Sequence, residues 1–197
     1  MKSLKFIVIT ALAAVLAGCV TPVGPVEVTR FHGPDTSVLA RGTISVEPAA
    51  GNSADSLEWR SYQAAIARQL VLLGYVEAAP GAGAQVAQLR YSRQTYRPDR
   101  ARGPVSVGVG GSTGSYGSGV GLGVGIDLSG RPPEQVATEL GVIIRNRASN
   151  TALWEGRASF VVNAKSPLAQ TQLGAPKMAE ALFKNFPGRS GETVTVR

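Results

Sequence analysis

Some segments of the chain repeat apolar residues at helical spacing, and others alternate apolar and polar residues as strands do. The order of these segments is the sequence feature that most constrains the fold. Only two segments repeat apolar residues at helical spacing: residues 56–73 and a segment that begins at Pro176. Most other segments alternate apolar and polar residues, as strands do. The strands are predicted at residues 26–32, 42–48, 85–97, 134–148 and 152–164, with a strand or tail at 192–197. Without regular βαβ alternation, this order predicts an α+β fold: a largely antiparallel sheet with two helices packed on one face.

Local signals predict where both helices begin and end. Asp55 and Glu58 have the spacing of a capping box, and Gly74 is suited to end the first helix. Pro176 is an acceptable first residue for the second helix, and Pro187-Gly188 would stop it. The apolar stripes of the two helices are Trp59, Tyr62, Ile66, Leu70 and Leu73, and Ala179, Leu182, Phe183 and Phe186.

Turn signals between the strands predict two hairpins. Gly33-Pro34-Asp35 would join strands 26–32 and 42–48, and Ser149-Asn150-Thr151 would join strands 134–148 and 152–164. We expect Asp35 to act as a turn residue after Pro34.

The N-terminus has the features of a bacterial export signal. Lys2 and Lys5 form a basic head, and residues 6–17 form an unbroken apolar run. This run is too short to span a bilayer well, because a transmembrane helix needs about 20 apolar residues.

The segment Leu16-Ala17-Gly18-Cys19 resembles the lipobox of bacterial lipoproteins, and Cys19 is the only cysteine in the chain. The resemblance implies cleavage before Cys19 and acylation of its thiol and new amino group. It divides the chain into a signal peptide (1–18), a lipidated N-terminus and linker (19–25) and a single periplasmic domain (26–197). An ordinary secretory signal with a chance cysteine is the alternative. Because no Asp follows the cysteine, we expect the outer membrane rather than the inner one.

The mature chain is basic. Its formal net charge falls from +7 to +5 when Lys2 and Lys5 leave with the signal. In the periplasm, such a protein meets phospholipid head groups and cell-wall carboxylates rather than nucleic acid. Five arginines cluster around Tyr91 and Tyr96 and are candidates for contact with anionic lipid or an envelope partner. A solvated strand end and loop is the alternative. These arginines are Arg90, Arg93, Arg97, Arg100 and Arg102.

The most unusual segment is glycine-rich and spans residues 104–128. Val120, Leu122 and Val124 alternate with glycines, which predicts a long hairpin with one aliphatic face and one nearly bare face. Three interpretations stay open: a long hairpin packed on the core, an edge that pairs with a partner strand, or a membrane-dipping hairpin in an oligomer.

Residues for catalysis or metal binding are sparse. Ser112 lies in a G-x-S-x-G match, but the nucleophile elbow needs a following helix, and none is predicted. His32 is the only histidine, so neither a zinc site nor any other metal or cofactor site is expected. We therefore expect a protein that is not an enzyme, with a hydrolase that uses Ser112 and His32 as the alternative.

Several segments resemble the bacterial lipoproteins that carry the domain of unknown function 4136. The resemblance covers roughly residues 26–188, and it implies an α+β domain on a lipid tether, with no established activity. The chain departs from the pattern at Gln85-Val86-Ala87, where such proteins often place an acidic residue. The segments that carry the resemblance are Leu70-Val71-Leu72-Leu73-Gly74-Tyr75, the strand 86–91, the glycine-rich strand, Leu153-Trp154-Glu155-Gly156-Arg157-Ala158 and Leu182-Phe183-Lys184-Asn185-Phe186-Pro187.

Together these features predict a lipoprotein anchored to the outer membrane on its periplasmic face. We expect a non-enzymatic binding or structural module that serves envelope maintenance. Its partner would be an envelope protein or an anionic lipid, and its oligomeric state stays open.

Overall fold

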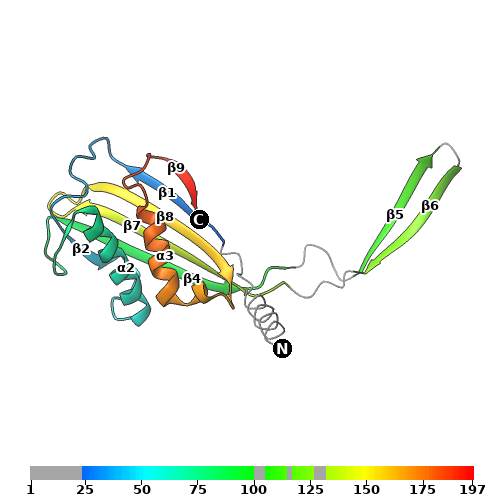
Figure 1. Ribbon diagram of the computed structural model, residues 1–197, viewed down its shortest axis with the longest axis horizontal. Helices are drawn as coiled ribbons and strands as arrows, with labels where there is room; N and C mark the ends of the chain where they lie inside the picture. The colour runs from blue at the N-terminus through cyan, green and yellow to red at the C-terminus, as the bar shows by residue number, and fades with distance from the viewer. Residues whose placement is uncertain (1–23, 100–104, 115–116, 127–131) are drawn as a thin grey trace, which may run out of the picture.

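The computed structural model describes residues 24–99, 105–114, 117–126 and 132–197, and for residues 105–114 and 117–126 it describes the backbone only. Its main element is a seven-stranded, mostly antiparallel sheet with the order β3-β2-β4-β7-β8-β1-β9 (Figure 1). Only the pairs β2–β3 and β2–β4 are parallel. The strands are β1 (Val26–His32), β2 (Thr43–Pro48), β3 (Val76–Glu77), β4 (Gln85–Tyr96), β7 (Gln135–Asn146), β8 (Ala152–Asn163) and β9 (Glu192–Val196).

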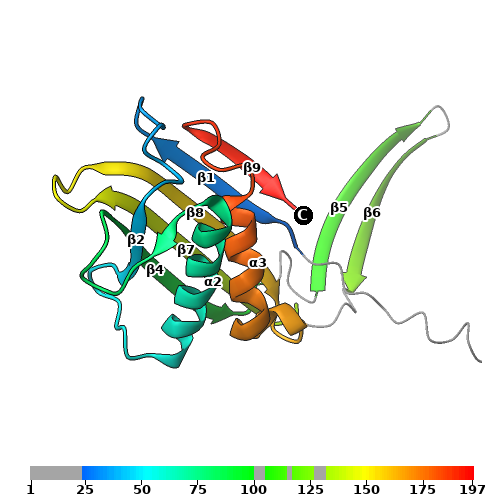
Figure 2. The ribbon, with the colours of Figure 1, turned by 60° about the vertical axis from the view of Figure 1, so that its left-hand side comes forward.

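Two helices, α2 (Leu57–Leu73) and α3 (Thr171–Phe183), lie side by side on one face of this sheet (Figures 1 and 2). A short 3-10 helix, η1 (Pro167–Ala169), leads into α3. This arrangement confirms the predicted α+β class, the largely antiparallel sheet and the two helices on one face.

The ends of α2 follow from its caps. Gly74 has a left-handed conformation with φ of 110°, and its N–H bonds to the carbonyls of the last turn, so its predicted role is confirmed. The predicted N-terminal cap was wrong by one residue. Ser56, not Asp55, accepts the hydrogen bond of Trp59 N at 3.2 Å, and the N–H of Asp55 bonds to Ser53 Oγ instead.

The start of α3 was also predicted wrongly. Pro176 lies inside the helix, which begins at Thr171. A proline there removes one helical hydrogen bond. Burial outweighs this cost, because Gly174, Ala175 and Met178 all pack into the core. Gly174 also lies so close to η1 that a Cβ would be 2.7 Å from the carbonyl oxygen of Leu168.

The core lies between the two helices and the sheet. Trp154 on β8 stacks on Phe183 of α3 with 5.3 Å between ring centroids, and Tyr62 of α2 stacks on Tyr91 of β4 at 4.8 Å. Arg30, on β1, is also buried, at 4% exposure. The largest fully buried side chains are Trp154, Tyr62, Phe160, Ile44, Ile66, Leu70, Leu89, Leu140, Ile144, Met178, Leu182 and Val26.

One predicted hairpin is confirmed and the other is wrong. β7 and β8 pair as an antiparallel hairpin, with Asn150 at a positive φ of 55° in the turn. β1 does not pair with β2: it lies between β8 and β9, with Glu27 opposite Ser159 and Thr195. β2 pairs in parallel with β4 because α2 carries the chain between them as a crossover.

The glycine-rich segment contains two paired strands, β5 (Val105–Gly114) and β6 (Gly117–Ile126). They are antiparallel, with Val105 opposite Ile126. The predicted aliphatic face of this hairpin and its packing depend on side chains, which the structure does not describe for these residues. Separately, no helix among the described residues is long and apolar enough to cross a membrane.

Candidate functional site

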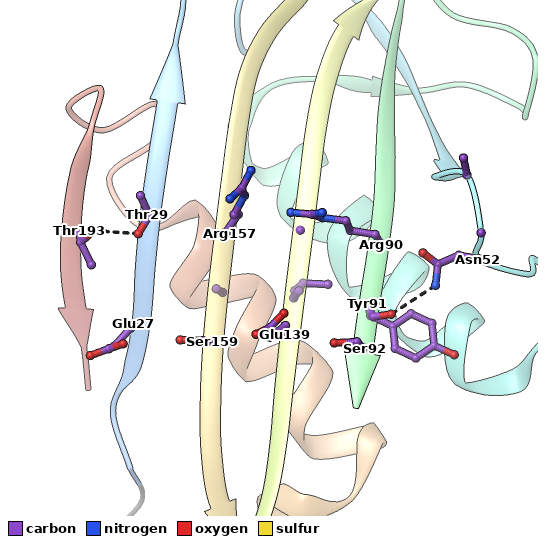
Figure 3. Close-up of a pocket in the computed structure, with 15 residues that line it drawn as sticks. Glu27, Thr29, Asn52, Arg90, Tyr91, Ser92, Glu139, Arg157, Ser159 and Thr193 are labelled. Atoms are coloured by element: carbon purple, nitrogen blue, oxygen red, sulfur yellow. Dashed lines mark hydrogen bonds between the residues drawn. The ribbon is translucent and has the colours of Figure 1, made fainter. Parts of the chain in front are cut away.

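The face of the main sheet that lies opposite α2 and α3 carries polar and charged side chains, and we call it the open face. Odd-numbered residues of β7, β8 and β1 point to this face, because side chains alternate along a strand. The strand register arranges them in two neighbouring rows that cross the sheet (Figure 3).

The first row is basic. Its register runs from Arg90 on β4 through Gly141 on β7 and Arg157 on β8 to Thr29 on β1 and Thr193 on β9. Arg90 extends across β7 toward Arg157 (Figure 3). It can do so because Gly141 has no side chain: a Cβ there would lie 2.5 Å from Arg90 Nε.

Three side chains of this row are held by local hydrogen bonds. Arg157 donates from Nε at 2.9 Å and from Nη2 at 2.7 Å to one carboxylate oxygen of Glu155. The hydroxyls of Thr29 and Thr193 are 2.8 Å apart and bond to each other. Arg90 is exposed, and none of the hydrogen bonds between described residues involves its side chain.

The second row is acidic and rich in hydroxyl groups. Ser92 on β4 lies opposite Glu139 on β7, Glu139 opposite Ser159 on β8, and Ser159 opposite Glu27 on β1. Both Glu27 and Glu139 are exposed. The two rows are two residues apart along each strand, which is about 7 Å.

A hollow of about 580 Å³ covers both rows. The loop after β2 forms one wall, where Asn52 Nδ2 donates to the carbonyl of Tyr91 at 3.3 Å (Figure 3). The lining residues are Glu27, Thr29, Ala50, Gly51, Asn52, Arg90, Tyr91, Ser92, Glu139, Leu140, Gly141, Arg157, Ala158, Ser159 and Thr193.

Such a lining can bind opposite charges at once. A guanidinium fork suits carboxylate or phosphate oxygens, whereas a carboxylate row suits an ammonium group. Among residues 24–99 and 132–197, no group of three or more His, Cys, Asp or Glu side chains could hold a metal ion.

Comparison with known proteins assigns the family. The domain of unknown function DUF4136 matches residues 34–188 of the chain. The chain belongs to the DUF4136 family. This match confirms the resemblance to the domain of unknown function 4136. The match covers every strand of the main sheet except β1 and β9.

This DUF4136 protein is also similar to individual proteins. An uncharacterised protein of Zymomonas mobilis is 28% identical over 215 residues, which cover 88% of this chain and 80% of the relative. Among solved structures, a PDZ domain protein from Parabacteroides distasonis has a TM-score of 0.48 at 10% identity, over 88% of this chain and 39% of that chain. A PelC dodecamer from Paraburkholderia phytofirmans has a TM-score of 0.45 at 11% identity, over 84% of this chain and 99% of that chain.

In the structure of this DUF4136 protein, the arginines that lie close together in the sequence are separated. Arg90 lies on the open face, but Arg93 lies on the helix side of β4, because three residues along a strand change the face. Arg93 Nη1 is 3.4 Å from Glu58 Oε1 and from Thr171 Oγ1, and its Nη2 donates to the carbonyl of Ala169. Arg93 therefore joins α2, η1 and α3. Arg97 is exposed after β4, and Arg100 and Arg102 lie outside the described residues.

The two residues of the hydrolase alternative lie in different elements of the DUF4136 chain. His32 ends β1, and its Nδ1 is 2.7 Å from the carbonyl oxygen of Gly33. Ser112 lies in β5 opposite Gly119, and its side chain is outside the description. Asp35 accepts a hydrogen bond from Ser37 N at 2.9 Å, and its bonds to Ser37 hold its pKa below the usual value, as suits a turn residue.

The predicted lipidation site, Cys19, and the lipobox residues Leu16, Ala17 and Gly18 lie outside the described residues.

Sequence reasoning missed most of the open face. Gly141, Glu139 and Arg157 are far from Arg90 in the chain, and only the strand register brings them together. One signal was present, because a glycine inside a predicted strand often marks a close approach of another group.

Proposed function

We propose that this protein is a lipid-anchored domain of the outer membrane that faces the periplasm and binds an envelope component on its open face, without a catalytic step. The anchor is supported by the export signal and by the resemblance of Leu16-Ala17-Gly18-Cys19 to a lipobox. Two or more acyl chains on one residue would hold a domain firmly on a membrane, whereas a single chain binds it only marginally.

The observation that carries the binding role is the placement of Arg90 over Gly141, beside Arg157 and one row from Glu139 and Glu27. Arg90, which lies across Gly141, makes no hydrogen bond within the described fold. Its placement therefore suits the binding of a ligand better than the stabilisation of the sheet. The neighbouring rows of opposite charge fit a polypeptide segment that presents both carboxylate and ammonium groups. We therefore propose an envelope protein as the partner.

Crosslinking in intact cells followed by capture of the tagged protein tests this binding role. The variant Arg90→Gln with Glu139→Gln should lose the crosslinked partner, because it removes one charge from each row. The matched control is Arg41→Gln with Glu77→Gln, which removes the same two charges at exposed sites outside the hollow. The control should keep the partner. A capture pattern that is the same for all three proteins would refute the open face as the binding site.

The anchor has a separate test. Cys19→Ala should abolish acylation and release the domain from the membrane, as measured by cell fractionation and by the mass of the mature N-terminal peptide. Recovery of the variant in the outer membrane at the level of the parent would show that another feature holds the protein there.

A second candidate function is oligomeric assembly through the glycine-rich segment. β5 and β6 pair with each other and with no other strand of the described chain. A two-stranded ribbon alone is only marginally stable, and its free edges can accept a partner strand. The size of the purified mature protein, with and without residues 108–125, tests this role. An unchanged monomeric size would exclude it.

A further inference from the structure

Five strand ends lie at the same end of the main sheet. We call this row of strand ends the tether edge. At this edge, Tyr96 ends β4 opposite Gln135, which begins β7 and lies opposite Asn163, the last residue of β8. Val26 begins β1 opposite Val196, the last residue of β9. Figure 1 shows the C-terminus beside the start of β1.

Gly24, two residues before β1, also lies at the tether edge. Gly24 lies against the end of β8, where a Cβ would be 2.8 Å from the carbonyl oxygen of Val161. From Cys19 to Val26 the chain is short enough to span at most about 25 Å when fully extended. An acylated Cys19 would therefore hold the tether edge close to the bilayer. The connection that contains β5 and β6 leaves the sheet after Tyr96 and returns at Gln135, at this same edge.

The exposed side chains of the tether edge suit a phospholipid surface. Arg97, Lys165 and Arg197 are exposed cations next to the ends of β4, β8 and β9. Two acidic residues, Asp99 and Glu134, are also exposed there.

Two partly exposed apolar side chains accompany these cations. Tyr96 and Val161 are each 43% exposed, and tyrosine is enriched where proteins meet the membrane interface. Arginine binds phosphate oxygens through its planar fork, and lysine adds a point charge.

We infer that the tether edge faces the membrane and that Arg97, Lys165 and Arg197 bind anionic phospholipid head groups. This inference rests on the anchor of the proposed function but not on the ligand of the open face. Basic residues and acyl chains act together at a membrane, because each lowers the rate at which the other leaves the surface.

Vesicle co-sedimentation of an unlipidated protein tests the inference. The protein is residues 19–197 with Cys19→Ser, expressed without the signal, and it keeps all the described core residues, which lie between Val26 and Val196. It should bind vesicles that contain phosphatidylglycerol, should bind phosphatidylcholine vesicles at least several-fold more weakly, and should lose binding at high salt.

A matched pair of triple variants locates the surface. Arg97→Gln, Lys165→Gln and Arg197→Gln together should weaken binding about tenfold or more. The control is Arg41→Gln, Arg68→Gln and Arg189→Gln, which removes three exposed charges away from the tether edge and should change binding by no more than about threefold. Far-ultraviolet circular dichroism checks that both variants are folded.

Two results would overturn the inference: no binding of the parent to anionic vesicles, or equal losses in the two triple variants, which would show dependence on net charge alone. Because this protein carries no lipid, neither result depends on whether Cys19 is acylated in the cell. The fractionation of Cys19→Ala decides that question separately.

Discussion

The Nε atom of Arg30, on β1, donates a 3.0 Å hydrogen bond to the carbonyl oxygen of Leu182, in the last turn of α3. Its Nη2 donates another at 3.0 Å to Ala181. The carbonyls at the end of a helix lack partners within the helix, and a cation there also favours the helix dipole. Burial lowers the pKa of Arg30, and the nearby Glu192 opposes that shift.

Replacing this buried arginine should therefore be costly. Arg30→Met keeps most of the side-chain volume but leaves two buried carbonyls without donors, so it should lower the free energy of unfolding by about 2–4 kcal/mol. Urea denaturation measures the loss. Arg189→Met, at an exposed site, should change stability by less than about 0.5 kcal/mol. Equal effects of the two substitutions would contradict the role of Arg30.

Two glycines in neighbouring strands should respond differently to alanine. At Gly156, a Cβ would overlap with Trp154 Cη2 and lie 2.8 Å from Leu182 Cδ1, and both atoms are packed in the core. Gly156→Ala should therefore destabilise the protein by about 1–3 kcal/mol. At Gly141, the Cβ would meet the flexible side chain of Arg90, which can move away into solvent.

Gly141→Ala should thus leave the free energy of unfolding within about 0.5 kcal/mol of the parent and still reduce capture of the partner, because it displaces Arg90. Thermal denaturation and the crosslinking experiment measure the two effects on the same samples. A large loss of stability with normal capture would assign Gly141 a packing role only.

The ionised carboxylate of Glu47 should stabilise the folded protein, and this stabilisation should be lost in acid. Its Oε1 accepts hydrogen bonds from Arg147 Nη2 at 2.5 Å, Ser45 Oγ at 2.7 Å and Gly81 N at 2.8 Å. Burial opposes ionisation, but these bonds outweigh it and hold the pKa of Glu47 below its usual value. A lowered pKa means that the stabilisation is complete above about pH 4.5 and disappears as the pH falls through the folded-state value.

Glu47→Gln should therefore cost about 1 kcal/mol at pH 7, and the difference from the parent should shrink toward zero as the pH falls below 4. Urea denaturation at several pH values measures this. Glu180→Gln, at an exposed position of α3, serves as the control and should show no such trend. A constant difference at all pH values would show that ionisation of Glu47 is not involved.

Tyr62 should make the protein sensitive to alkali. Burial, with help from Glu58, raises the pKa of its phenol to about 12. The unfolded chain releases this proton near pH 10, whereas the folded chain keeps it. The stabilisation of the fold by the neutral phenol is therefore complete below pH 10 and is lost as the pH rises to about 12. The free energy of unfolding of the parent should fall by about 2–3 kcal/mol over this pH range because of Tyr62.

Tyr62→Phe removes this group, so its stability should fall less steeply between pH 10 and 12 than that of the parent. Denaturation curves at pH 9 and pH 11.5 provide the comparison. The same slope in both proteins would show that other groups cause the alkaline loss.

Local patterns in the sequence predicted most of the elements but little of the arrangement. The alternation in β1, β4 and β8 and the glycine at position 74 predicted their elements because these signals lie within a few residues. The start of α3 was missed because Gly174 and Pro176 are poor helix formers, and only tertiary burial makes that turn helical.

The open face could not be predicted for a different reason. Arg90 and Arg157 become neighbours through the register of three strands, and no spacing in the chain encodes that register. The arginine cluster that the sequence did suggest is divided by the pleat, since Arg90 and Arg93 point to opposite faces.

The position of β1 between β8 and β9 has a consequence for biogenesis. β1 is the first strand among the described residues, yet both of its neighbours come from residues 152–196. Until those residues follow, β1 exposes both backbone edges, and the chain is open to proteases and to wrong strand pairing. A chain truncated before residue 152 would therefore lack both strands that β1 pairs with.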